Sequence, residues 1–353
     1  MNSNFIELPK LVFLAQQIPW FGKHTGYEQL PTFIRKTIDE TQVISVQNGI
    51  IQRILGKTYS TYRKWSDRNS YHVAAELKLA ITRLFQPNSI SHILYLEDSL
   101  PFLDCWQKAP ANLIGTIHLP PSQWNSDRLK NLARLSSGIL LYQRDLEFFE
   151  SYVGKGRIHF IHYGVDTDFF HPLSTESPKT KRILFAGHYL RNTSMLHRVI
   201  VKLSKKHPDL QFDLLVPEHA RNTEGLLQLL KHPAVTWHKN LTDEALRHLY
   251  QTSYFLLLPM NESGANTAVV ESLSCGLPVI TTDVGGIRDY GGADIFPIVA
   301  NDDDNAMIDL VEKYLDNPDL RNEVAINCRN FAEQKLAWSV VAQKHLEVYK
   351  KLS

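Results

Sequence analysis

The sequence predicts an α/β protein of two domains, each built around a parallel β-sheet. The chain has 353 residues, more than one hydrophobic core usually organises, so two domains of roughly 150 to 200 residues each are expected. In both halves short apolar segments alternate with stretches of helical length, and strands that alternate with helices form parallel sheets. We expect the two domains to face each other across a central cleft.

Six short apolar segments in the first half are predicted to be strands: residues 11–15, 42–46, 92–97, 113–118, 138–142 and 158–164. The pattern starts again in the second half, where the predicted strands are residues 182–187, 212–217, 234–238, 254–259, 278–282 and 295–299. Helices are predicted between them, including residues 194–207 and 243–252.

A stretch rich in Pro, Ser, Thr and Lys, residues 171–181, separates the two series of strands and has the composition of an exposed connection. We therefore expect an N-terminal domain of residues 1–172 and a C-terminal domain of residues 173–337.

Composition excludes several classes of protein. A formal net charge of +1 gives no signal for nucleic-acid binding. Three cysteines, odd in number and far apart, argue against a disulfide framework and favour a reducing compartment. The first residues lack the order of a signal peptide, and the apolar run at residues 11–15 is too short to span a bilayer. We expect a cytoplasmic protein.

The most informative stretch is residues 259–286, PMNESGANTAVVESLSCGLPVITTDVGG. A strand ends here, a loop of small residues follows, and a helix begins at once. The small loop residues let a pyrophosphate approach the backbone, where the helix start can bind it; they are Gly264, Ala265, Asn266 and Thr267. Glu271, about one turn further, is placed to accept hydrogen bonds from both hydroxyls of a ribose. The alternative is an ordinary loop and helix with a surface glutamate.

This stretch resembles the donor-site signature of glycosyltransferase family 4, whose members have two acidic residues around a small-residue turn, then a helix, a cysteine-glycine-leucine-proline turn and a strand. The resemblance implies a GT-B fold and a retaining, metal-independent enzyme without a cofactor. Its substrate would be a nucleotide diphosphate sugar, UDP- or GDP-linked. In the family, the first acid stands eight positions before the second. Here the position eight before Glu271 is Ser263, and Glu262 stands nine before Glu271. Whether Glu262 or Ser263 takes the first-acid role stays open.

Two further segments resemble the family. Residues 161–172, IHYGVDTDFFHP, are similar to the segment that links its domains. In RILFAGHYLRNTSML, which starts at residue 182, the family has an arginine and a lysine that neutralise the donor diphosphate, whereas this chain has His188 and Thr193. Arg191 is the strong cation nearby, and its planar fork suits two phosphate oxygens. The alternative is an arginine at a solvated helix start.

In the first half, WFGKHTGYEQL resembles the family's glycine-bearing acceptor-side loop. Gly22 and Gly26 would let the backbone close under a substrate, with Lys23 and His24 projecting toward it; a flexible turn is the alternative. His118 follows a later strand, where the family carries a histidine, and could hydrogen-bond a sugar hydroxyl or take up a proton near pH 7. A lone histidine is more often structural.

The last residues, AWSVVAQKHLEVYKKL, resemble the family's closing helix, which crosses back to the first domain. The resemblance therefore joins residues 338–353 to the N-terminal domain.

No metal site is predicted. The run Asp302–Asp304 contains the acid pair that metal-dependent glycosyltransferases use, but it precedes the helical pattern AMIDLVEKYL and reads better as an N-cap cluster.

Together these features imply transfer of a hexosyl-type sugar from the nucleotide sugar to an acceptor hydroxyl of a glycan, a lipid-linked molecule or a small molecule. Arg191, Glu262 and His118 are the catalytic candidates. Two alternatives stand beside this function. One is a nucleotide-sugar 2-epimerase of the same fold. The other is a degenerate, non-catalytic subunit that binds sugar nucleotides, which the substitutions at His188, Thr193 and Ser263 motivate.

Residues 45–90 carry a local charge of +5 from seven cations and two acids: Arg53, Lys57, Arg63, Lys64, Arg68, Lys78 and Arg83 against Asp67 and Glu76. Aromatic residues of the kind that settle at a headgroup boundary lie among them: Tyr59, Tyr62, Trp65 and Tyr71. One interpretation is peripheral contact with the anionic inner face of the membrane, which would suit a lipid-linked acceptor. The other is a solvated basic helix pair whose aromatics pack on the sheet.

Overall fold

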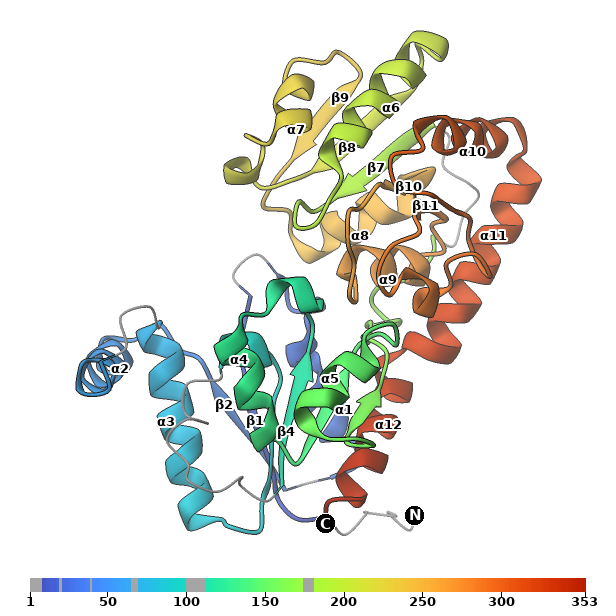
Figure 1. Cartoon of the computed structure of the whole chain (residues 1–353). Coiled ribbons are helices and arrows are strands. Elements are labelled where there is room, and N and C mark those ends of the chain that lie inside the picture. Colours follow the sequence, from blue (N-terminus) through green and yellow to red (C-terminus); the bar gives the residue numbers. More distant parts are fainter. Residues whose placement is uncertain (1–7, 19–20, 39, 65–68, 100–111, 174–180) are drawn as a thin grey trace. The chain divides into compact units, whose positions relative to one another are not determined.

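The computed structural model describes residues 8–18, 21–38, 40–64, 69–99, 112–173 and 181–353. It divides into two compact units (Figure 1). The first unit contains Met1–Phe21, Gly26–His162 and Trp338–Ser353, and the second contains Gly22–Thr25 and Tyr163–Ala337. Most of the predicted linker, residues 171–181, lies outside the described residues.

The first unit has a six-stranded parallel sheet in the order β2-β1-β3-β4-β5-β6. Its strands are β1 (Leu11–Ala15), β2 (Thr41–Ser45), β3 (Ile90–Ile93), β4 (Leu113–Ile117), β5 (Ser137–Leu140) and β6 (Ile158–Phe160). The order reverses beside β1, and in open parallel sheets ligands bind beyond the carboxyl ends of the strands at such a point.

The helices of the first unit are α1 (Leu30–Ile34), α2 (Ile50–Tyr62), α3 (Ser70–Phe85), α4 (Ser126–Asn131), α5 (Leu146–Val153) and α12 (Trp338–Lys350). The C-terminal helix α12 packs against α1 and buries Trp338 and Tyr349 in this core. The Tyr349 hydroxyl is hydrogen-bonded to Nδ1 of the buried His92 at 2.7 Å, which satisfies both polar groups in the apolar interior.

The second unit has a six-stranded parallel sheet in the order β12-β11-β10-β7-β8-β9. Its strands are β7 (Arg182–Ala186), β8 (Gln211–Leu215), β9 (Val235–His238), β10 (Phe255–Leu258), β11 (Val279–Thr282) and β12 (Ile298–Val299). The order reverses between β7 and β10. All four residues of β10 are buried, as expected of a central strand covered on both faces.

The helices of the second unit are α6 (Thr193–Lys206), α7 (Glu224–Leu229), α8 (Asp243–Thr252), α9 (Thr267–Ser274), α10 (Asp304–Asp316) and α11 (Pro318–Phe331). Helix α6 contacts α7 and α10, while α9 contacts α11. The two sheets and their helices confirm the predicted α/β class, and the helices predicted at 194–207 and 243–252 are α6 and α8.

Several predicted strands differ at their ends from the observed ones, and the strand predicted at 158–164 is β6, which ends at Phe160. The strand predicted at 92–97 is β3, which ends at Ile93, and the chain then forms a 3₁₀ turn at Leu96–Asp98. The strand predicted at 295–299 shortens to Ile298–Val299, since Pro297 has no backbone N–H to donate to a neighbouring strand. Among the described residues, no helix is both long and apolar enough to cross a bilayer.

Candidate functional site

The loops that follow β7 and β10 lie at the reversal point of the sheet of the second unit. Residues 187–192 follow β7, residues 259–266 follow β10, and α9 begins at Thr267. The exposed N–H groups and partial positive charge of a helix start at such a point favour an anion. The predicted site stretch therefore lies where this topology places ligands.

Asn266 and Arg191 fix the geometry of the start of α9. The Asn266 side chain is the N-cap and accepts a hydrogen bond from the Ala268 N–H at 3.1 Å. The same Asn266 oxygen accepts from Nη2 of Arg191 at 3.3 Å. An isolated antiparallel bridge between Arg191 and Met260 joins the two loops. These contacts hold the small-residue loop, the helix start and one cation together.

The guanidinium of Arg191 lies against protein acceptors. Nε donates to the Ala186 carbonyl at 3.1 Å and Nη1 donates to the Tyr189 carbonyl at 3.0 Å. Burial lowers the pKa of Arg191 to about 10, so it remains a cation at neutral pH. The structure thus places Arg191 beside the loop. Part of its planar guanidinium, which we predicted to bind two phosphate oxygens, donates to these backbone carbonyls instead.

Glu271 is almost fully buried, at 3% exposure, on the second turn of α9. Its Oε1 accepts a hydrogen bond from the Thr25 hydroxyl at 2.6 Å. Burial raises the pKa of Glu271 to about 7, against the hydrogen bonds from Thr25 and Tyr250, which lower it. The carboxylate is therefore costly to ionise and already has donor partners.

Gly22–Thr25, called the anchor segment from here on, is held against the rest of the second unit by side-chain hydrogen bonds. The Lys23 N–H donates to Asp243 at 2.7 Å, Nδ1 of His24 lies 2.7 Å from Asp166, and Thr25 donates to Glu271.

The packing of the anchor segment is close. A Cβ atom at Gly22 would lie 1.3 Å from an oxygen of Asp243, so a larger residue there would displace the contact. The His24 ring stacks on Phe169, with 3.7 Å between ring centroids. The predicted acceptor-side residues 22–24 thus have their partners on α8 and on residues 166–169.

The other residues predicted around the donor loop differ in exposure. Ser263 is buried, and its hydroxyl donates to the Gly264 carbonyl at 3.0 Å. Glu262 is half-buried and accepts from the Ser263 N–H at 3.0 Å. Burial, the charge of His219 and the charge of Arg191 lower the pKa of His188, so its imidazole is neutral near pH 7 and supplies no charge to neutralise a phosphate.

In the first unit, His118 follows β4. Its Nε2 is hydrogen-bonded to the Leu94 carbonyl at 2.7 Å, and its ring stacks on Tyr95. Burial lowers the pKa of His118 to about 4. A histidine with this pKa is neutral near pH 7, so of its two predicted roles we keep the hydrogen bond to a sugar hydroxyl as a proposal. Gly26 precedes the 3₁₀ turn Tyr27–Gln29 in the same unit.

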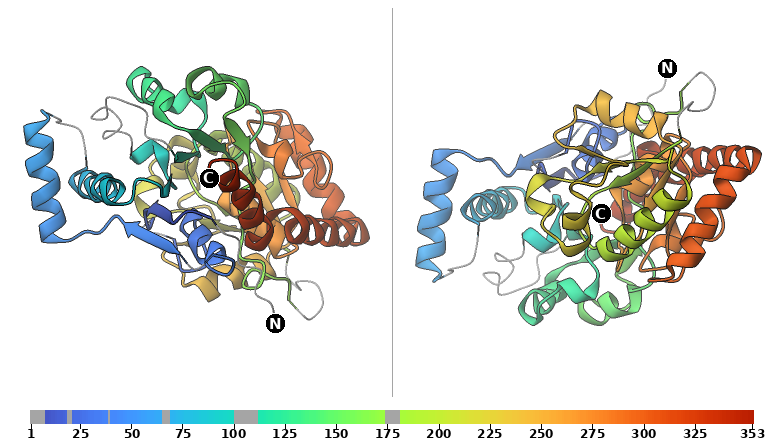
Figure 2. Two further views of the ribbon diagram at one scale, coloured as in Figure 1. Left: turned by 90° about the horizontal axis from the view of Figure 1, so that it is seen from below. Right: turned by 90° about the horizontal axis from the view of Figure 1, so that it is seen from above.

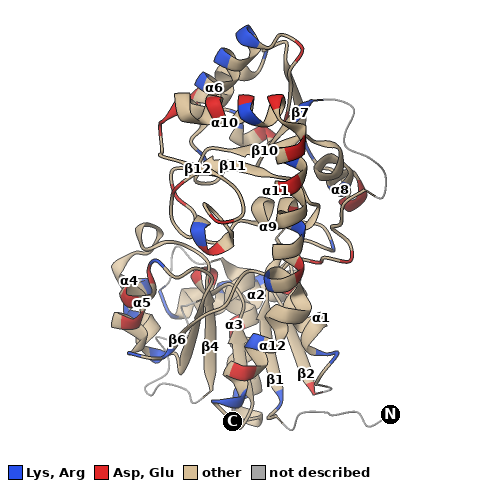
Figure 3. Cartoon of the chain, turned by 90° about the vertical axis from the view of Figure 1, so that its right-hand side faces the viewer, with Lys and Arg blue, Asp and Glu red and all other residues tan. Residues whose placement is uncertain are grey.

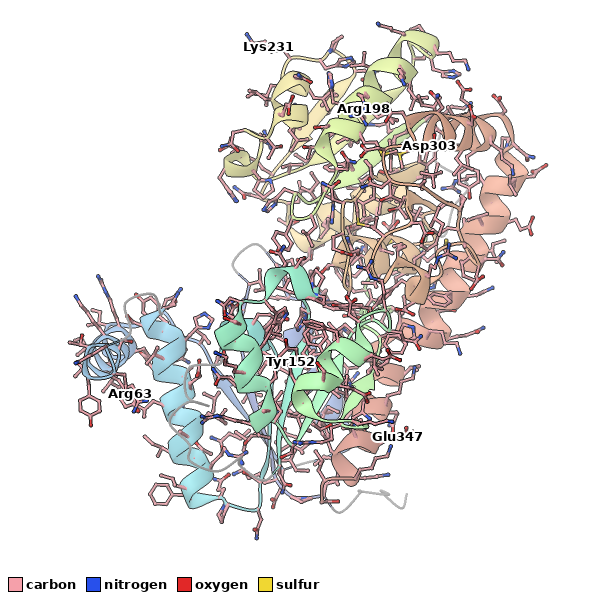
Figure 4. The ribbon with its side chains drawn as sticks, viewed as in Figure 1. Arg63, Tyr152, Arg198, Lys231, Asp303 and Glu347 are labelled. Carbon is pink, nitrogen blue, oxygen red and sulfur yellow. The ribbon has the colours of Figure 1, made fainter. Side chains whose placement is uncertain are left out.

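The acidic run at residues 302–304 caps and anchors a helix. Asp303 accepts from the Ala306 N–H at the start of α10. Asp304 is paired through both oxygens with Arg198 on α6, at 2.8 and 2.9 Å. Figure 3 shows the charged residues of α6 beside those of α10, and Figure 4 labels Arg198 and Asp303 there. The predicted N-cap role is confirmed.

Several residues with strong contacts were missed from the sequence. Thr25 and Tyr250 contact Glu271, and Asp166 and Asp243 hold the anchor segment. Their partners lie far away along the chain, so no local pattern marks them. Glu97 had a signal, an acid directly after an apolar run. It accepts from the backbone N–H of His118 and Leu119, and burial raises its pKa to about 7.

Comparison with sequence families matches most of the second unit. Residues 166–331 match the family described as Glycosyl transferases group 1. The alpha-maltose-1-phosphate synthase of Mycolicibacterium smegmatis is 20% identical over 223 residues, which cover 56% of this chain and 57% of that protein. The chain spans about half the length of the curated relatives it matches.

Comparison with solved structures covers nearly the whole chain. Sucrose-phosphate synthase from Thermosynechococcus elongatus matches with a TM-score of 0.76 at 15% identity, over 98% of this chain and 99% of that one. The structure of Anabaena HepE in complex with UDP-glucose matches with a TM-score of 0.71 at 15% identity, over 97% and 99%. At such identities the likeness shows the fold. With two parallel six-stranded sheets and these neighbours, the chain has the GT-B fold, and its residues 166–331 belong to the group 1 glycosyl transferases, glycosyltransferase family 4.

Proposed function

We propose that this protein is a retaining glycosyltransferase that moves a hexosyl-type sugar from a UDP- or GDP-linked donor to an acceptor hydroxyl. The observation that carries the proposal is the joined start of α9, where a small-residue loop, the Asn266 cap and Arg191 meet beside the buried Glu271. The match of residues 166–331 to the group 1 glycosyl transferases supports it, as does the structural neighbour that was solved with UDP-glucose.

In this proposal the second unit binds the donor. The N–H groups of residues 264–267 bind the diphosphate, and Glu271 accepts hydrogen bonds from the ribose hydroxyls. Arg191 adds positive charge near the leaving diphosphate, and by holding Asn266 it also keeps the loop in position. Glu262 takes the first-acid role beside the donor sugar, since it is more exposed than Ser263 and carries a carboxylate.

The acceptor is assigned to residues outside the donor loop. Gly22, Lys23 and His24 of the anchor segment and Gly26 directly after it are the proposed acceptor-side residues, and His118 is proposed to hydrogen-bond a sugar hydroxyl. The acceptor is a glycan, a lipid-linked molecule or a small molecule, and the buried free thiols of Cys275 and Cys328 suit a cytoplasmic location.

Retention of configuration follows from the family resemblance. The acceptor hydroxyl attacks the donor sugar from the face that the diphosphate leaves. The bond from the anomeric carbon to the phosphate oxygen breaks as the new glycosidic bond forms, and a phosphate oxygen takes the acceptor proton. The protein's part is to stabilise charge on the leaving diphosphate, so this reaction requires no protein nucleophile.

Donor turnover tests the proposal. Purified protein is incubated with UDP-glucose, other UDP-sugars and GDP-mannose, and the products are separated by chromatography. A transferase should release free nucleoside diphosphate slowly without an acceptor and faster with one, and Glu271→Gln should reduce this release. Glu323→Gln, an exposed glutamate on α11, is the matched control. An isomerised nucleotide sugar would instead show an epimerase, and binding without turnover would show a non-catalytic subunit.

A further inference from the structure

Helix α2 turns its small and polar residues toward the protein and its apolar residues outward. Its buried residues are Gly56 and Ser60. The residues that protrude are four aliphatic side chains and one tyrosine: Ile50 at 79% exposure, Ile51 at 69%, Ile54 at 59%, Leu55 at 50% and Tyr62 at 78%. A helix on the surface of a water-soluble domain normally has the opposite arrangement.

The exposed apolar residues of α2 share one side. At about 100° per residue, they fall within an arc of roughly 140°, and Gly56 and Ser60 lie opposite its centre. The face toward α3 is fixed by close packing, since a Cβ atom at Gly56 would lie 1.8 Å from the Ser70 carbonyl oxygen. Figures 1 and 2 show α2 on the outer side of α3, away from the sheet of its unit. Rotating α2 to bury the apolar side would break this contact.

Every charge on and directly after α2 is positive. Residues 50–64 contain four cations and no acidic residue: Arg53, Lys57, Arg63 and Lys64. All four cations are exposed, and Figure 4 labels Arg63 at the edge of the unit. Within α2 and α3, as the structure describes them, the acidic residue is Glu76 on α3, and it is buried at 3% exposure. Trp65, Asp67 and Arg68 lie outside the described residues.

We propose that α2 docks in the plane of an anionic lipid surface. Its apolar side enters the boundary between headgroups and acyl chains, and its cations meet the lipid phosphates. Each cation near such a surface strengthens binding by about 1 kcal/mol. The helix has 13 residues, fewer than the roughly 20 that span a bilayer, so it lies along the surface.

Charge complementarity favours lipid over a second copy of this chain. Pairing two copies of the α2 face would bring two clusters of cations together, and like charges across an interface oppose association. An anionic membrane presents the opposite charge beside an apolar layer, which matches both properties of the face. This inference does not depend on the proposed transferase activity.

Co-sedimentation of the full chain with vesicles tests the proposal. The protein should sediment at low salt with vesicles of phosphatidylcholine and phosphatidylglycerol, and stay in the supernatant with phosphatidylcholine alone. Higher salt should release it, since salt screens exposed charges. Arg53→Gln with Lys57→Gln should weaken binding by about fivefold per cation, or roughly thirtyfold together. Ile54→Ser with Leu55→Ser should weaken it at least as much.

Matched controls come from the second unit. Lys205→Gln with Lys231→Gln removes two exposed cations, and Leu227→Ser with Ile326→Ser removes two exposed apolar residues. Both controls should bind like the unchanged protein, and circular dichroism shows whether each variant is folded. No sedimentation with the mixed vesicles at low salt would overturn the proposal, as would full binding by folded Ile54→Ser, Leu55→Ser protein. A dimer in light scattering that the same variant dissociates would assign the face to a second copy instead.

Discussion

The titration of Glu271 should make donor binding weaken as the pH falls through 7. The pKa of this carboxyl is raised to about 7, because burial and the negative charge of Asp243 raise it by more than the hydrogen bonds from Thr25 and Tyr250 lower it. In the free protein about half of the Glu271 side chains are therefore protonated at pH 7. In our proposal the ionised Glu271 carboxylate accepts hydrogen bonds from both ribose hydroxyls. A protonated Glu271 must therefore lose its proton before the donor binds.

The size of the effect follows from that pKa. The ionised fraction is about nine-tenths at pH 8 and about one-tenth at pH 6. Because apparent affinity scales with the competent fraction, the affinity for UDP-glucose should fall about tenfold over this range, or about 1.4 kcal/mol. The same shift has a consequence for folding. The folded state holds the Glu271 proton more tightly than the unfolded chain does. The stability contributed is full below the unfolded carboxyl pKa, about 4.3, and is lost as the pH rises through 7.

Titration calorimetry with UDP-glucose at pH 6, 7 and 8, at constant ionic strength, measures the effect. The diphosphate diester of this ligand keeps the same charge over that range. Glu271→Gln should bind more weakly at pH 8 by roughly 1.5 to 3 kcal/mol, since it removes a charged acceptor, and its affinity should not change with pH. Glu323→Gln should behave like the unchanged protein.

An affinity that stays flat, or that rises toward pH 6, would refute the reasoning. A rise is the sign expected from His188, whose imidazole gains positive charge as the pH falls and would attract the diphosphate. Either result would show that Glu271 does not meet the ribose as an anion.

Three other predictions follow from the same site. Thr25→Val should tighten UDP-glucose binding at pH 8 by about 1 kcal/mol, because it removes a protein donor that the ribose replaces; weaker binding in calorimetry would place Thr25 in the bound site. Arg191→Lys should lower kcat more than donor affinity, because an ammonium group cannot bond to Asn266 and to the two backbone carbonyls at once as the planar guanidinium does. Equal losses of kcat in steady-state kinetics and of donor affinity in calorimetry would indicate that Arg191 contributes to ground-state binding alone. Turnover should survive EDTA, because Asp302 and Asp304 pair with cations and the Asp303 side chain caps α10; loss that manganese restores would contradict this.

The fold was predictable from the sequence because the strands of a doubly covered parallel sheet are continuous apolar runs. β10 and β11 have no exposed residue, and their sequences FLLL and VITT contain no charged residue. The ends of strands were less predictable. After Ile93 the apolar run continues to Leu96 while the backbone leaves the sheet, and Glu97 in the turn that follows accepts the N–H groups after β4.

The candidate site was predictable where its residues are neighbours in the sequence. The loop, the Asn266 cap and Glu271 all lie within residues 259–286, where spacing along a strand, loop and helix fixes their relation. The contact between Thr25 and Glu271 joins residues 246 positions apart. Only the fold brings such a pair together, so the local sequence around one residue does not predict the other.

The orientation of α2 lay outside sequence reasoning for a different reason. The local charge was visible, but which side of the helix faces α3 depends on packing at Gly56, where Ser70 approaches closely. A helix with apolar residues on one side is normally expected to bury that side. Here the steric fit of a glycine outweighs the apolar pattern.

The contact between Thr25 and Glu271 also indicates how a buried carboxylate can serve a reversible site. A carboxylate that is 3% exposed requires hydrogen-bond donors whether or not a ligand is present. In the free protein, the hydroxyls of Thr25 and Tyr250 supply them. If a ribose hydroxyl replaces the Thr25 hydroxyl, one neutral donor is exchanged for another, and a ligand without that hydroxyl would leave the buried carboxylate short of a donor. Donor binding energy must then come mainly from the diphosphate at residues 264–267, while Glu271 discriminates between ligands with and without the ribose hydroxyls. A 2′-deoxy donor should therefore bind more weakly to the unchanged protein, and to a similar extent as the complete donor to Glu271→Gln; equal binding of both donors in calorimetry would assign ribose recognition to other residues.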